Sequence, residues 1–91
     1  MKSEKGKNLP EKKFRAGAIT VTVWRNETEK GSYSSVQLER SYKDKDNNWK
    51  KTNSMRLNDL PRASLLLNKA YEHLVMKMQE SEQQVAVESV M

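Results

Sequence analysis

Aromatic and positively charged residues are interleaved in the segment 36–57, where two strand-like runs are joined by a polar turn. Lys and Arg side chains attract phosphates, and the rings of Tyr and Trp offer flat surfaces on which unpaired bases can stack. These residue types on a β-hairpin predict a surface that grips a single nucleic-acid strand. The candidate contact residues are Trp24, Arg40, Tyr42, Lys43, Trp49, Lys50, Lys51, Thr52 and Arg56.

Each of these candidates also has a structural interpretation. Trp24 and Trp49 can simply pack at the edges of a sheet, and Tyr42 shares the strand face of apolar residues, which favours a partly buried ring. Lys50 and Lys51 are neighbours on a strand and must point to opposite faces. At most one of these two lysines therefore joins a given surface.

The hydrophobic pattern predicts an α+β domain, in which a twisted antiparallel sheet is followed by one C-terminal helix. The order of elements is β-β-β-α, or the same with the first strand split in two. Apolar and polar residues alternate in the strands. Polar turns separate them, and Gly31 is available for a positive φ. The strands are expected at about 14–24, 33–42 and 49–57.

A helical period begins at Asn58, which can cap the helix, and continues to about Gln79. Leu65 and Met76 fall on its outer side, either as ordinary exposed residues or as part of a dimer interface. The stripe expected to cover the sheet comprises Leu60, Ala63, Leu67, Ala70, Tyr71, Leu74 and Met78. The opposite face of the sheet is then expected to present Thr20, Thr22, Trp24, Gln37, Lys50, Thr52, Ser54 and Arg56.

Charge and composition divide the chain into three parts. Residues 1–12 are rich in Lys and indicate a flexible basic arm, and residues 13–79 form the nucleic-acid-binding domain of sheet and helix. Residues 80–91 hold three Glu and neither Lys nor Arg, and are expected to be a disordered acidic tail. Because only 35% of the 91 residues are hydrophobic, the core must be thin, and such domains often pair with a second copy.

The residue inventory argues against catalysis. The net charge of +5 favours an anionic partner, and the lack of Cys excludes disulfides and thiolate metal sites. His73 is the only histidine; it is expected at the surface and leaves no pair of nucleophile and base. Asp44 and Asp46 lie beside lysines that oppose cation binding. We therefore expect a protein that is not an enzyme and has no metal, cofactor or small-molecule substrate.

Targeting signals are also missing from the sequence. No apolar run approaches the roughly 20 residues that cross a bilayer, and the N-terminus lacks the apolar segment of a signal peptide. The expected location is intracellular, either cytoplasmic or associated with the nucleoid, without a membrane partner.

The order of the elements resembles the positive cofactor four-like transcriptional coactivators and their bacterial, phage and archaeal relatives. In that family the strand before the turn reads approximately apolar-Arg-x-Tyr, the turn reads Asp-x-x-Gly, and the last strand carries Lys before a Leu-containing helix start. The resemblance covers roughly 14–74, and Asn47-Asn48 stands where the family usually has Gly. The matching residues are Leu38, Arg40, Tyr42, Lys43, Asp44, Asp46, Lys50, Lys51, Leu57 and the helix from Asn58.

This resemblance implies a homodimer built largely through the helices, with single-stranded DNA lying across the sheets. The expected function is DNA binding with low sequence specificity in transcription, replication or repair. A one-residue shift in register would send the Arg40 and Tyr42 side chains to the opposite face. RNA is an alternative ligand, because stacking and phosphate contacts tolerate either sugar. A protein-interaction module with an exposed sheet edge is the alternative from another class.

Overall fold

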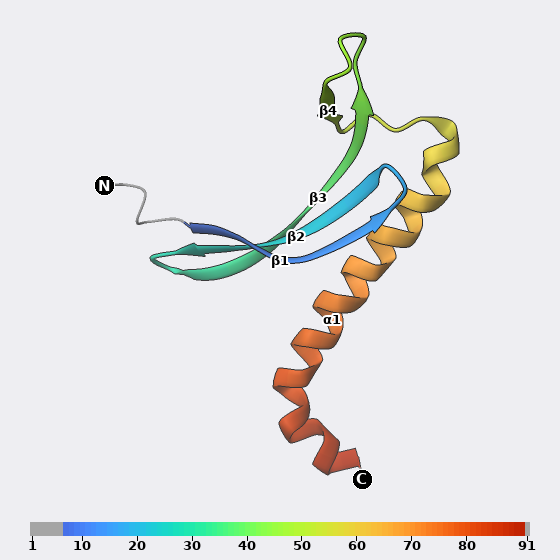
Figure 1. Cartoon of the computed structure of the whole chain (residues 1–91). Coiled ribbons are helices and arrows are strands. Elements are labelled where there is room, and N and C mark those ends of the chain that lie inside the picture. Colours follow the sequence, from blue (N-terminus) through green and yellow to red (C-terminus); the bar gives the residue numbers. More distant parts are fainter. Residues whose placement is uncertain (1–6, 91) are drawn as a thin grey trace.

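A computed structural model describes the backbone of residues 7–90 and the side chains of residues 7–78. The chain is α+β, with a four-stranded antiparallel sheet in the order β1-β2-β3-β4 followed by one helix (Figure 1). The first expected strand is divided by a turn at Gly17 and Ala18, so that four strands are present. The elements are β1 (Lys7–Ala16), β2 (Ile19–Thr28), β3 (Gly31–Lys43), β4 (Trp49–Thr52), a 3-10 turn (Leu57–Asp59) and α1 (Leu60–Val90).

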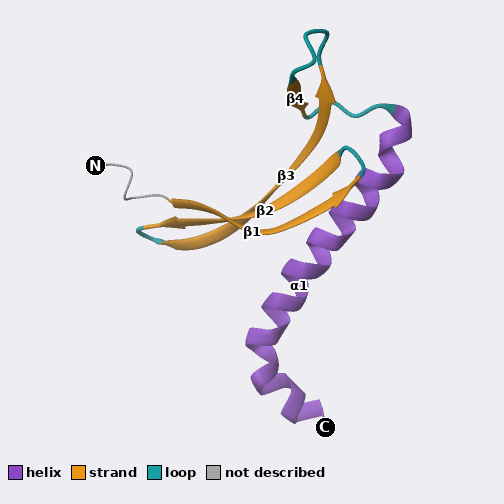
Figure 2. Ribbon diagram, viewed as in Figure 1, coloured by secondary structure: helices purple, strands orange, loops and turns teal. Residues whose placement is uncertain are grey.

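Strands β2 and β3 form a long hairpin. Their pairing runs from Thr28 opposite Gly31 to Ile19 opposite Arg40. Beyond Arg40, β3 continues without β2 and pairs only with β4. We call residues 40–52, which comprise the end of β3, the turn and β4, the ribbon. It projects past the ends of β1 and β2 (Figures 1 and 2).

The core lies where α1 crosses one face of β1 and β2. Ile19, Val21 and Val23 are fully buried, and their alternation along β2 sends all three toward the helix. The helix meets them with small residues and one leucine, so its backbone can approach the sheet closely. The buried helical residues are Ala63, Leu66 and Ala70, and Phe14, Ala16, Leu38, Met55 and Leu74 pack around them.

The helix face differs from the predicted stripe. Leu66 is buried in place of Leu67, which lies about 100° further around the helix. Ala63, Ala70 and Leu74 do belong to the covered face, as predicted. The remaining members of the predicted stripe are exposed: Leu60, Leu67, Tyr71 and Met78.

Three element boundaries also differ from prediction. Residues 7–12 were assigned to a flexible arm but belong to β1, whereas residues 1–6 lie outside the described part. The backbone of α1 continues to Val90, because Glu, Gln and Ala are good helix formers and nothing breaks the segment. The last strand ends at Thr52 rather than near Leu57. Within the described residues no helix has the length and apolar character to cross a membrane.

Candidate nucleic-acid interface

The cross-strand register decides which candidate residues share a face of the sheet. Residues directly opposite in an antiparallel pair point to the same side. Trp24 pairs with Ser35, and Lys43 pairs with Trp49; Ser35 and Lys43 are an even number of residues apart on β3. Trp24, Lys43 and Trp49 therefore share the face that α1 leaves uncovered. We call it the open face; its large and charged residues are Lys13, Arg15, Trp24, Tyr33, Gln37, Glu39, Lys43, Trp49 and Lys51.

The prediction for β4 was wrong, because Lys50 and Thr52 were expected on the sheet face away from the helix. Lys50 pairs with Tyr42 and Thr52 pairs with Arg40, which places all four on the side of the helix. The alternation within β4 could not reveal this, because polar residues occupy both of its sides. The face depends on the turn, where Asn47 adopts a φ of 69°. Asn tolerates this left-handed conformation better than most residues, so the turn forms without a Gly.

Trp24 lies in the middle of the open face and is half-buried. Its Nε1 donates a hydrogen bond to Gln37 Oε1 at 3.0 Å, which fixes the orientation of the ring. Asn26 Nδ2 donates to Ser35 Oγ at 2.9 Å in the same region. These side chains border a shallow hollow of about 420 Å³, whose amide and hydroxyl groups can bond to base edges or phosphates.

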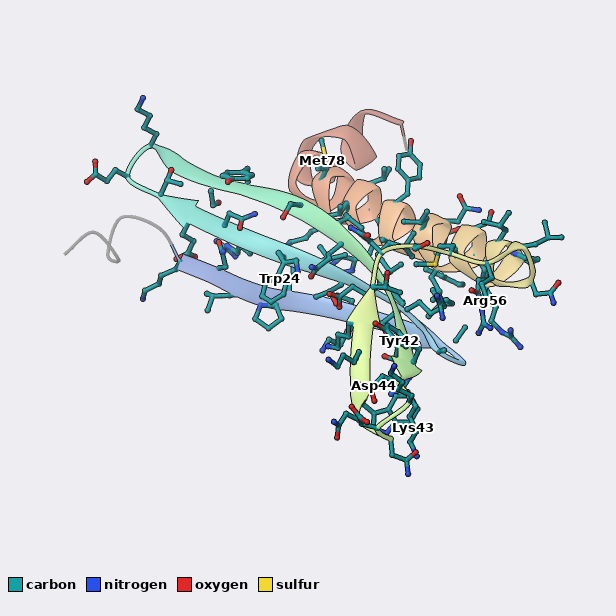
Figure 3. The ribbon with its side chains drawn as sticks, turned by 90° about the horizontal axis from the view of Figure 1, so that it is seen from above. Trp24, Tyr42, Lys43, Asp44, Arg56 and Met78 are labelled. Atoms are coloured by element: carbon teal, nitrogen blue, oxygen red, sulfur yellow. The ribbon has the colours of Figure 1, made fainter. Side chains whose placement is uncertain are left out.

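Trp49 presents the most accessible ring of the open face. Its relative exposure is 68%, and Lys43 Nζ lies 5.4 Å from the centre of the ring. The neighbouring turn is well fixed, because Asp44 Oδ1 accepts hydrogen bonds at 2.9 Å from the backbone N–H groups of Asp46 and Asn48. Figure 3 shows Lys43 and Asp44 at the end of the ribbon, with Trp24 on the adjoining sheet. A cation and a free ring are thus held together on a rigid support.

Two of the candidate lysines have carboxylate partners. Lys51 Nζ lies 3.8 Å from Glu39 Oε1, and Lys50 Nζ lies 3.6 Å from Asp44 Oδ2. Because both lysines are exposed, these pairs are worth little in water and can be exchanged for a phosphate. Lys51 lies on the open face and is available there, whereas Lys50 lies on the opposite side.

Arg40 and Tyr42 make contacts within the domain. The Arg40 side chain is only 14% exposed, and its Nε lies 3.4 Å from Asp59 Oδ2. The same Nε donates to the carbonyl of Ser54 at 3.1 Å, and the guanidinium stands 5.6 Å from the centre of the Tyr42 ring. Arg40 therefore ties the ribbon to the start of the helix.

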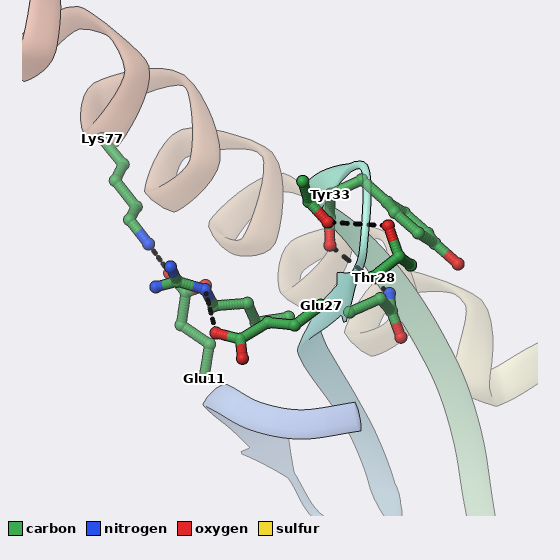
Figure 4. Close-up of polar contacts among 8 residues, drawn as sticks. Glu11, Glu27, Thr28, Tyr33 and Lys77 are labelled. Carbon is green, nitrogen blue, oxygen red and sulfur yellow. Dashed lines mark hydrogen bonds and ion pairs between the residues drawn. The ribbon is translucent and has the colours of Figure 1, made fainter. Parts of the chain in front are cut away.

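A cluster on the other side of the molecule was not foreseen from the sequence. His73 Nε2 lies 2.9 Å from Glu11 Oε2, and Lys77 also donates to this carboxylate (Figure 4). The hydrogen bond from Lys77, followed by that from His73, lowers the pKa of Glu11 below its usual value. His73 is thus half-buried and paired rather than a plain surface residue. Glu11 reaches the helix because the register of β1 shifts between Pro10 and Lys12.

Comparisons with known proteins give no relative: no protein-family model, curated protein or solved structure matches the chain. Within the described residues no group of three or more His, Cys, Asp or Glu is placed to hold a metal ion. The interpretation of the site therefore depends on the rings, charges and contacts of the open face.

Proposed function

We propose that this protein binds single-stranded DNA across the open face with little sequence preference. The observation that carries the proposal is the exposed Trp49 ring beside Lys43, on a rigid ribbon that shares its face with Trp24. Bases would stack on the two tryptophans, which accept any base because every base has a flat π-face. Phosphates would lie against the cations between and beyond the rings, namely Lys13, Lys43 and Lys51.

Tyr33 extends this surface beyond the residues predicted from the sequence. It lies on the open face opposite Asn26, and 60% of it is exposed. The rings of Tyr33, Trp24 and Trp49 thus follow β3 and the ribbon from one end to the other. A strand of several nucleotides would fit this arrangement, since each exposed ring can take one base.

Replacing Trp49 with Ala is expected to weaken binding of a single-stranded oligonucleotide on the order of tenfold, because stacking of one base contributes about 1–3 kcal/mol. Fluorescence anisotropy of a labelled oligonucleotide measures the affinity. Leu65→Ala is the matched control, since Leu65 is a large exposed residue on the helix, away from the open face. Equal losses for both variants, or tighter binding of the wild type to duplex than to single strand, would contradict the proposal. An RNA oligonucleotide in the same titration tests the alternative ligand.

We also propose that the functional unit is a homodimer. The exposed residues Leu60, Leu67, Tyr71 and Met78 recur along one flank of α1. Met78 borders a hollow of about 440 Å³ together with Ser32 and Ser34 of β3, so this flank runs beside β3. The outer edge of β3 before Arg40 has no partner strand among the described residues, and no charged residue lies between Lys30 and Glu39.

A second copy suits this flank and edge because a two-fold axis brings identical surfaces together. The uncharged edge avoids like-charge repulsion between two chains of net charge +5. An interface of ordinary size buries about 800 Å² on each partner, and one buried aromatic side chain supplies about 150–250 Å². Burial of the Tyr71 ring would therefore supply a sizeable part of such an interface.

Tyr71→Glu is expected to convert the dimer to a monomer, because it places a charge in the apolar flank. Sedimentation velocity at micromolar concentrations measures the mass of the particle. Leu65→Glu introduces the same charge on the other side of α1 and is expected to leave the dimer intact. A monomeric wild type, or dissociation by Leu65→Glu alone, would refute this arrangement; the second result would favour an interface around Leu65 and Met76.

A further inference from the structure

We infer that Arg15 and Arg62, with Arg56 at the neighbouring start of α1, form a phosphate site at the base of the ribbon, a role that presupposes the nucleic-acid binding proposed above. The site lies at the turn between β1 and β2, at the start of α1. Its ligand would be an internal phosphodiester of the same strand whose bases stack on the ribbon.

Two guanidinium groups meet at Gly17. Arg15 Nε donates to the Gly17 carbonyl at 3.1 Å. A β-carbon built on Gly17 would lie 3.4 Å from Arg62 Nε, so the Arg62 side chain crosses the turn from the helix. Gly17 has a φ of +62°, a conformation that other residues adopt at a cost. The sharp turn therefore brings a β1 arginine and an α1 arginine against the same residue.

The positive charge in this region exceeds what its two carboxylates, Asp59 and Glu39, can neutralise. Glu39 lies across Thr20 from Arg15 and already faces Lys51 Nζ at 3.8 Å. Asp59 is 8% exposed and lies near both Arg40 Nε, at 3.4 Å, and Arg56 Nε, at 3.8 Å. Neither Arg15 nor Arg62 forms an ion pair with a described carboxylate. The four guanidinium groups and Lys51, set against Asp59 and Glu39, leave a net charge of +3.

The side chain of Arg56 is 72% exposed, so it can leave its weak contact with Asp59 for a stronger anion. Figure 3 shows it at the end of the molecule where α1 begins. Guanidinium groups present planar, forked donors that match the oxygens of a phosphate. The first turn of α1 adds a small favourable field, because the amino end of a helix is partly positive.

The site is continuous with the open face. The backbone N–H of Ser41 donates to the Ala18 carbonyl at 2.9 Å, which docks the β1–β2 turn against the base of the ribbon. Ser41 pairs in turn with Lys51. A strand that follows the ribbon from Trp49 past Lys51 therefore arrives at the turn that Arg15 and Arg62 flank. This continuity favours a phosphodiester of the bound strand over a free anion.

The test uses the double variant Arg15→Gln/Arg62→Gln in the full chain. The matched control is Arg25→Gln/Lys69→Gln, which removes the same charge at exposed positions away from the turn. Binding to single-stranded DNA is measured over a series of salt concentrations. Each lost phosphate contact lowers the slope of log affinity against log salt by about 0.7. We expect the Arg15/Arg62 variant to lose about 1.4 from the slope, on the scale of two such contacts, and the control to keep a slope close to that of the wild type.

An abasic oligonucleotide separates phosphate contacts from base stacking. The Arg15/Arg62 variant should weaken its binding, whereas Trp49→Ala should leave it almost unchanged. Competition by inorganic phosphate at constant ionic strength distinguishes a free-anion site, which would lose its contribution at millimolar phosphate. Arg62→Lys retains the charge and should recover part of the slope.

Two negative results have different meanings. If the wild type binds DNA but the Arg15/Arg62 variant keeps the wild-type slope, the phosphate site is refuted and the stacking surface stands. If the wild type binds no single strand at low salt, the nucleic-acid function itself fails. A loss of slope equal to that of the control would also overturn the site, because general charge would explain it.

Discussion

Asp59→Ala is expected to lower the free energy of unfolding by about 3–5 kcal/mol, the usual cost of removing one partner of a buried ion pair. Asp59 Oδ2 accepts a hydrogen bond from the Arg56 backbone N–H at 2.8 Å and faces Arg40 Nε at 3.4 Å. Its loss would leave the nearly buried Arg40 charge without a counterion and the 3-10 turn before α1 without its cap. Since a small domain has a total stability of only about 5–15 kcal/mol, this change would remove a large share of it.

Urea denaturation followed by circular dichroism measures this change. Asp46→Ala is the control, because Asp46 lies in the exposed turn and contributes only its backbone N–H to the hydrogen bonds there. Asp59→Asn keeps an acceptor for the Arg56 N–H but lacks the charge, so it should lose less stability than Asp59→Ala. A midpoint for Asp59→Ala equal to that of Asp46→Ala would show that Arg40 does not depend on this carboxylate.

The sequence predicted Arg40 as a ligand contact, whereas the structure pairs it with Asp59. An Arg between apolar and aromatic strand residues has the composition of a binding surface, and the resemblance to a DNA-binding family strengthened that interpretation. Its pairing with Asp59 joins residues 19 positions apart, across the ribbon and the 3-10 turn. No local sequence pattern predicts a contact between residues so far apart in the chain. The prediction that Arg40 contacts a ligand depended on residue type and on that resemblance, and neither carries information about Asp59.

The central strands and the order of elements were predictable because strong local signals specify them. Alternating β-branched residues define β2, and the Asp-rich and Asn-rich segment defines the turn before Trp49. The first half of β1 was missed because it is largely polar on both sides and contains Pro10. Such a segment is a strand only through its pairing with β2, and Pro is tolerated there because β1 is an edge strand with a shifted register.

The helix carried two overlapping apolar patterns, and the sequence did not distinguish them. Ala63, Leu66, Ala70 and Leu74 meet the sheet, while Leu60, Leu67, Tyr71 and Met78 recur at helical spacing and remain exposed. Periodicity shows that a stripe is apolar but not which surface covers it. The exposed stripe has the larger side chains. This arrangement is expected if the small residues allow close packing on the sheet and the large ones contact a second copy of the chain.

Salt is expected to weaken binding of single-stranded DNA about 100-fold between 50 and 200 mM. Five cations on the open face and at its end provide the charge: Lys13, Arg15, Lys43, Lys51 and Arg62. Arg56 is left out because Asp59 Oδ2 already lies 3.8 Å from its Nε. With about 0.7 counterions released per phosphate contact on a single strand, five contacts give a slope of about −3.5. Fluorescence anisotropy at four or five salt concentrations determines this slope.

Lys43→Gln tests whether the slope arises on the open face, and Lys50→Gln is its control on the opposite side of the ribbon. The two lysines differ by register rather than by composition, since Lys43 pairs with Trp49 and Lys50 pairs with Tyr42. We expect only Lys43→Gln to reduce the slope, by about 0.7. Equal reductions would mean that the ribbon acts as a diffuse positive charge, and a slope near zero for the wild type would remove phosphate contact from the mechanism.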